Sequence, residues 1–87
     1  MREVLIAKRY FSAKMTGPLT LEYYLLVSTL VGELEIYGVK ILERRSGTVA
    51  SAVALTTSSQ RIFHLIDLLS EGSVTPTSLA DIVEDWL

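Results

Sequence analysis

The chain has 87 residues, of which 49% are apolar and 21% charged, with a formal net charge of −2. This length fits one hydrophobic core, so we predict a single domain over residues 1–87. The absence of cysteine excludes disulfides, thiol catalysis and thiolate metal sites, and the negative charge argues against general electrostatic binding to nucleic acid.

The apolar content is high for so small a domain. Small domains have a large surface for their volume, so apolar residues at this density cannot all be buried. The surplus predicts a partner surface, most simply for a second copy of the same chain. The N-terminal residues lack a signal-peptide pattern, and the apolar runs are far shorter than the roughly 20 residues that span a bilayer. We therefore expect a cytoplasmic protein without a membrane partner.

Residues 3–11 alternate with a period of two and include β-branched and aromatic side chains, which predicts a strand. Lys8 and Arg9 place charge on both of its faces, as is typical of an edge strand. Residues 12–18 follow as a turn, because Gly17-Pro18 disfavours regular structure.

Residues 19–30 form the longest apolar run and predict the central strand. One face is wholly apolar or aromatic and is expected to be the core: Leu21, Tyr23, Leu25 and Val27. The other face is mixed: Glu22, Tyr24, Leu26 and Ser28. The two faces therefore have different environments.

Residues 33–44 predict a third strand, in which Gly38 marks a bulge or the close approach of another backbone. Residues 45–48 are typical of a hairpin turn. Residues 48–55 predict a fourth strand with two unlike faces. Val49, Val53 and Leu55 lie on one side, and the alanines at 50, 52 and 54 form a shallow surface on the other.

Two helices are predicted after the strands. The hydroxyl residues 56–59 offer N-caps for a helix over 60–71, and Gly72 is a natural C′ residue. Thr75-Pro76 is typical of the start of a second helix, with its apolar stripe at Leu79, Ile82, Val83 and Trp86. Strands joined by short turns and followed by helices predict an α+β fold: a four-stranded antiparallel meander with two C-terminal helices on one face (ββββαα).

Three segments resemble a family of small bacterial proteins of unknown function. The segments are Glu22-Tyr23-Tyr24-Leu25-Leu26, Tyr37-Gly38-Val39-Lys40-Ile41 and the ending Thr75-Pro76…Val83-Glu84-Asp85-Trp86. The resemblance spans most of the chain. It implies a bacterial, cytoplasmic protein and no particular chemistry.

Candidate chemical groups are few. His64 and Asp67 lie one helical turn apart and could serve as a general base and its orienting group, but their pattern is typical of a solvated helix face. Asp81, Glu84 and Asp85 form an acidic cluster without the backbone carbonyls of a calcium loop. We predict no catalytic, cofactor-binding or metal-binding residue.

Two short helices can cover about one face of a four-stranded sheet. The other face would still carry large apolar side chains, so we predict a non-catalytic protein–protein interaction or regulatory module that forms a homodimer. The predicted partner-binding residues are Tyr24, Leu26, Tyr37, Val39 and Ile41. One alternative is a nucleic-acid-associated regulator that uses tyrosines with Lys40, Arg44 and Arg45 of the basic N-terminal half. Another is an enzyme centred on His64.

Overall fold

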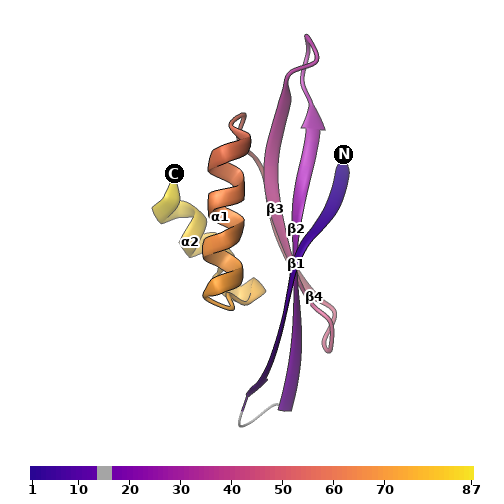
Figure 1. Cartoon of the computed structure of the whole chain (residues 1–87), viewed down its shortest axis with the longest axis vertical. Helices are drawn as coiled ribbons and strands as arrows, with labels where there is room; N and C mark the ends of the chain where they lie inside the picture. The colour runs from indigo at the N-terminus through magenta and orange to yellow at the C-terminus, as the bar shows by residue number, and fades with distance from the viewer. Residues whose placement is uncertain (14–16) are drawn as a thin grey trace.

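The computed structural model describes residues 1–13 and 17–87. The elements are β1 (Arg2–Ala13), β2 (Gly17–Thr29), β3 (Glu35–Glu43), β4 (Thr48–Thr56), α1 (Ser59–Glu71), a 3₁₀ turn η1 (Pro76–Ser78) and α2 (Leu79–Trp86). The strands form one antiparallel sheet in the order β1-β2-β3-β4. Figure 1 shows both helices against one face of this sheet, with the other face uncovered. The predicted ββββαα α+β fold is confirmed.

The sheet is long and narrow, and the molecule measures 48 × 24 × 17 Å. Strand β2 has 13 residues and β1 has 12, both longer than predicted. A turn was predicted over residues 12–18. Residues 12–13 belong to β1 and residues 17–18 to β2, and residues 14–16 lie outside the described part of the chain. The predicted start of β3 at Glu33 is wrong. Glu33 has φ +66°, which is incompatible with a strand, so β3 begins at Glu35.

The predicted positions of the two helices and of the N-cap of α1 are largely confirmed. The Ser58 hydroxyl accepts a hydrogen bond from the Arg61 amide at 3.2 Å and caps α1. Gly72 ends α1, and its amide donates to the Leu68 carbonyl. Gly72 is the C-cap with φ −84°, and the left-handed residue that often follows a helix is Ser73, with φ +48°. Pro76 begins η1, which leads directly into α2.

The core lies between the sheet and the helices. Strand β2 contributes the face that was predicted to be core: Leu21, Tyr23, Leu25 and Val27. Strand β3 adds Ile41, which pairs with Tyr23, and Val39, which pairs with Leu25. The helices supply the remaining buried side chains: Ile62, Leu65, Ile66, Leu69, Leu79 and Val83. Burial of these aliphatic groups is the main source of stability.

The β3–β4 pair contains the predicted irregularity at Gly38. The register shifts between Tyr37 and Val39, and a Cβ at Gly38 would lie 2.3 Å from the Ala52 carbonyl oxygen. Ala54 on the facing strand has φ +54° and is exposed. The predicted alternation of β4 is therefore wrong after Val53, and Leu55 packs against the core rather than sharing the Val49 side.

Polar side chains of the sheet also hold the helices. The Arg9 guanidinium donates from Nε to the Ser70 carbonyl at 2.8 Å, at the C-terminal end of α1. The Tyr23 hydroxyl donates to the Val74 carbonyl at 2.9 Å, and burial raises the pKa of Tyr23 to about 12. Arg61 of α1 lies 4.4 Å from the centre of the Trp86 ring, which connects the two helices.

Candidate functional site

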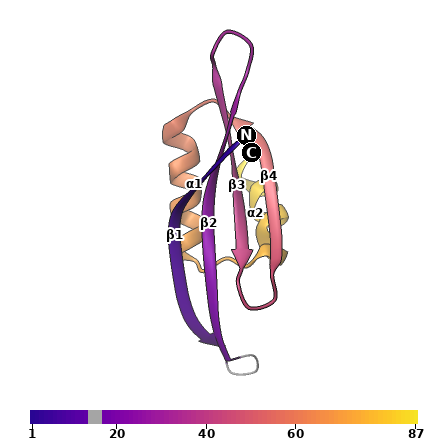
Figure 2. The same ribbon diagram turned by 90° about the vertical axis from the view of Figure 1, so that its right-hand side faces the viewer.

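The candidate site is the uncovered face of the sheet, which Figure 2 shows toward the viewer with the helices behind it. The even-numbered residues of β2 point to this face, because the odd-numbered residues point to the helices. The register places Leu5 beside Tyr24 and Tyr24 beside Lys40, and it places Lys8 beside Glu22 and Glu22 beside Leu42. Leu42 pairs in turn with Val49 of β4, so all four strands contribute side chains to one surface.

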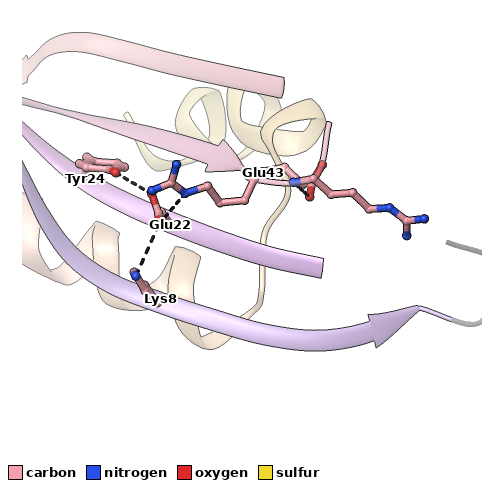
Figure 3. Close-up of polar contacts among 6 residues, drawn as sticks. Lys8, Glu22, Tyr24 and Glu43 are labelled. Atoms are coloured by element: carbon pink, nitrogen blue, oxygen red, sulfur yellow. Dashed lines mark hydrogen bonds and ion pairs between the residues drawn. The ribbon is translucent and has the colours of Figure 1, made fainter. Parts of the chain in front are cut away.

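Glu22 is the centre of this face and is only 1% exposed. Its carboxylate accepts a hydrogen bond from the Tyr24 hydroxyl at 2.6 Å and one from Arg44 Nε at 3.0 Å. Lys8 Nζ lies 3.7 Å away as a further counter-charge. Figure 3 shows Glu22 between Lys8 of the neighbouring strand and the Tyr24 ring. A buried carboxylate is stable in a fold only when it is paired and hydrogen-bonded in this way.

These contacts shift two pKa values. The hydrogen bond from Tyr24 lowers the pKa of the Glu22 carboxyl group, burial opposes that effect, and the hydrogen bond and charge of Arg44 reinforce it. The same hydrogen bond raises the pKa of Tyr24, because the phenol donates to a negative acceptor. Glu22 is therefore ionised, and Tyr24 protonated, across the neutral pH range.

A second set of contacts adjoins the first. Lys40 Nζ lies 4.8 Å from the centre of the Tyr24 ring and forms an ion pair with Glu3. The contacts link β1, β2 and β3 on the same face, with Tyr24 common to both sets. Four charged side chains of this face, Glu3, Lys8, Lys40 and Arg44, are thus held by partners within the chain.

Apolar side chains surround the polar centre. Leu26 is buried on the uncovered face, while Leu5 and Tyr10 of β1 and Val49 and Val53 of β4 are exposed. Ile36 and Leu42 are half-buried. The face therefore combines an ion-paired polar centre with exposed aliphatic and aromatic groups, which is the composition of a protein interface.

The structure separates the five predicted partner-binding residues. Tyr24 and Leu26 lie on the uncovered face. Val39 and Ile41 are 1% and 0% exposed beneath the helices, so their prediction as partner contacts is wrong. They pair with Leu25 and Tyr23, and residues that pair across strands point to the same side. Tyr37 also lies on the helix side, and its hydroxyl donates to Glu35.

Sequence reasoning missed the ion pairs of Glu22. It grouped Lys40 and Arg44 with the tyrosines as a platform for bases, whereas Arg44 pairs with Glu22 and Lys40 with Glu3. The available signal was an acidic residue within an apolar strand, with basic residues at even-numbered positions in the two neighbouring segments: Lys8 in β1 and Arg44 just after β3. The strand register was needed to read it.

The other candidate groups lie elsewhere. His64 and Asp67 are exposed on α1, and the acidic residues Asp81, Glu84 and Asp85 are exposed on α2. Among the described residues there is no group of three or more His, Cys, Asp or Glu side chains placed to hold a metal ion. Over the same residues, no helix has the length and apolar character needed to cross a membrane.

A family model described as "Family of unknown function (DUF6514)" matches residues 2–87. The chain belongs to this family. The match confirms the resemblance to a family of unknown function that the tyrosine-rich strands and the C-terminal segment indicated. No curated protein and no solved structure matches the chain.

Proposed function

We propose that this DUF6514 member is a non-catalytic protein–protein interaction module that forms a homodimer through the uncovered face of its sheet. The observation that supports the proposal is the contrast between the faces. Two helices cover one face, while the other exposes Leu5, Tyr10, Val49 and Val53 around an ion-paired polar centre. Removing exposed apolar groups of this kind from water makes binding of a partner favourable.

The dimensions of the face fit a second copy. Four strands spaced about 4.8 Å apart, each with about nine residues at about 3.3 Å, give a footprint of roughly 570 Å². Two such faces bury roughly 1,100 Å², near the lower end of specific interfaces at about 1,200 Å². Packed sheets lie about 10 Å apart, which the exposed side chains can fill. An interface of this size is typical of reversible, transient association.

The contacts of Glu22 support burial of the face. Lys8 and Arg44 already neutralise this carboxylate, and Glu3 already pairs with Lys40. A partner would therefore cover charges that have counter-charges, which lowers the free-energy penalty of removing water. For the same reason, the nucleic-acid alternative is less favoured, because Lys8, Lys40 and Arg44 are engaged with carboxylates rather than directed at phosphates.

The alternative of an enzyme requires His64 in a cleft, and the structure places it on the exposed surface of α1. The bacterial and cytoplasmic expectation stays a prediction. A gel shift at two salt concentrations separates the nucleic-acid alternative, since phosphate contacts weaken steeply with added salt.

Sedimentation equilibrium at micromolar concentration tests the homodimer with a matched pair of variants. Leu5→Arg places an unpaired cation on the uncovered face, and Leu68→Arg places one on the outer surface of α1. The two leucines are similarly exposed, at 43% and 47%. Leu5→Arg should raise the dimer dissociation constant at least tenfold, because the interface would desolvate the charge. A wild-type chain that sediments at 9.6 kDa throughout contradicts the proposal.

A further inference from the structure

The two edges of the sheet differ in their protection against further pairing. The edge strand β1 carries charges at Arg2, Glu3, Lys8 and Arg9 and is interrupted by a bulge between Leu5 and Ala7. Strand β4, with the sequence TVASAVALT, has neither a charge nor a proline, and its irregularity at Ala54 leaves residues 48–52 in regular register with β3. Within the described chain, no strand pairs with its outer edge, which lies at one side of the sheet in Figure 2. Its outward N–H and C=O groups are therefore a template for another strand.

A cavity of about 340 Å³ adjoins this edge, between β4 and the C-terminal helix. Ala50 and Ala52 form its sheet side, and Leu79 and Val83 of α2 line the helix side. The short alanine side chains leave this space open, and its lining is mainly apolar. Glu84 also lines it and adds a negative charge. The edge and the cavity together provide backbone groups, a site for an apolar side chain and a preference for cations.

We infer that β4 and this cavity bind an extended basic segment of another protein. The segment adds to the sheet as a fifth strand, inserts one aliphatic side chain between β4 and α2, and places Lys or Arg beside Glu84. This site is separate from the uncovered face and goes beyond the homodimer. Backbone pairing supplies affinity, and the cavity and the carboxylate supply specificity.

Charge and shape favour this occupant over a second copy. Helix α2 also carries exposed Asp81 and Asp85, and residues 46–87 hold one basic against five acidic side chains. Antiparallel pairing of two β4 strands would bring two acidic α2 helices to the same face of the joined sheet. It would also set Ala50 and Ala52 against the alanines of the partner, because paired residues share a face, and would leave the cavity unfilled.

The probe is an acetylated and amidated heptapeptide, Thr-Lys-Thr-Leu-Thr-Lys-Thr, in which leucine and both lysines share one face. Matched peptides replace both lysines by glutamate, or the leucine by alanine. Amide chemical shifts of the isotope-labelled chain are followed up to about 1 mM peptide. We expect shifts in β4 and α2, and at least fivefold weaker binding of each matched peptide. No shifts, shifts centred on the uncovered face, or equal affinities for the three peptides would overturn the inference.

Two variants test which residues of the chain contact the peptide. Glu84→Lys should weaken binding of the lysine peptide about fivefold, whereas Glu71→Lys, at an exposed glutamate of α1, should not. Ala52→Leu fills the cavity and should weaken binding about tenfold; thermal unfolding verifies that this variant folds. If it does not fold, the alanine peptide tests the cavity instead. An effect of Ala52→Leu on self-association with unchanged peptide affinity would assign the cavity to a second copy and overturn the inference.

Discussion

The two faces of strand β2 differ although they come from alternate residues of one segment. The odd-numbered residues form a close-packed apolar layer beneath the helices, where Leu65 of α1 is fully buried. The even-numbered residues place a buried carboxylate on the uncovered side, surrounded by hydrogen-bond donors and exposed apolar groups. The comparison shows that a face without a covering layer can still bury a side chain, provided that neighbouring strands supply its counter-charges.

The largest expected effect concerns the covered face. Leu65→Ala removes buried methyl groups and leaves a cavity, so it should lower the free energy of unfolding by about 2–5 kcal/mol. Leu68→Ala, on the exposed surface of the same helix, should change it by less than about 0.5 kcal/mol. Urea denaturation of both variants measures the difference. Equal effects would contradict the assignment of the core.

The next effect concerns the centre of the uncovered face. Glu22→Ala leaves the Tyr24 hydroxyl without its acceptor and removes the counter-charge of Arg44, so it should cost about 1–3 kcal/mol of stability. Glu3→Ala, at a half-exposed ion pair with Lys40, should cost less than about 1 kcal/mol. Chemical denaturation at pH 7 compares the two. A loss for Glu22→Ala no larger than that for Glu3→Ala would mean that the buried carboxylate is energetically equivalent to a surface one.

Acid should remove the contribution of Glu22. The pKa of this carboxyl group is lowered in the folded chain from an ordinary value of 4.5, so the unfolded chain takes up the proton first as the pH falls. The contribution is complete above pH 4.5 and is lost as the pH drops through the lower pKa of the folded state. Denaturation curves between pH 7 and pH 2 should show a shallower fall for Glu22→Gln than for the wild type. Parallel curves would contradict this assignment.

The smallest effect tests one hydrogen bond. Tyr24→Phe keeps the ring beneath Lys40 and removes the hydroxyl that donates to Glu22, so it should cost about 1 kcal/mol. The pKa of Glu22 should rise, because this hydrogen bond is the largest cause of its lowering. NMR titration of the Glu22 side chain measures the rise. An unchanged pKa would assign the lowering to Arg44 and Lys8 instead.

The sequence predicted most of the fold and less of the site. The period of two in β2 and the capped amphipathic pattern of α1 are local signals, and both elements occur where they were expected. The start of β3 was misplaced because Glu33 adopts a left-handed backbone that its residue type does not signal. Val39 and Ile41 were wrongly predicted as partner contacts. The alternation of residues within β3 shows which side chains share a face, but only the pairing of β3 with β2 shows which of its faces the helices cover.

The sequence by itself determined the element order and the apolar face of β2, since hydrophobic periodicity and turn chemistry act over a few residues. Only the tertiary structure decided which strands lie beside each other in register, and hence that Lys8 and Arg44 neutralise Glu22. It also decided that the Ala54 bulge turns Leu55 to the core and that an open cavity lies beside β4. These features arise from contacts between residues far apart in the chain, whose geometry depends on the whole packed sheet.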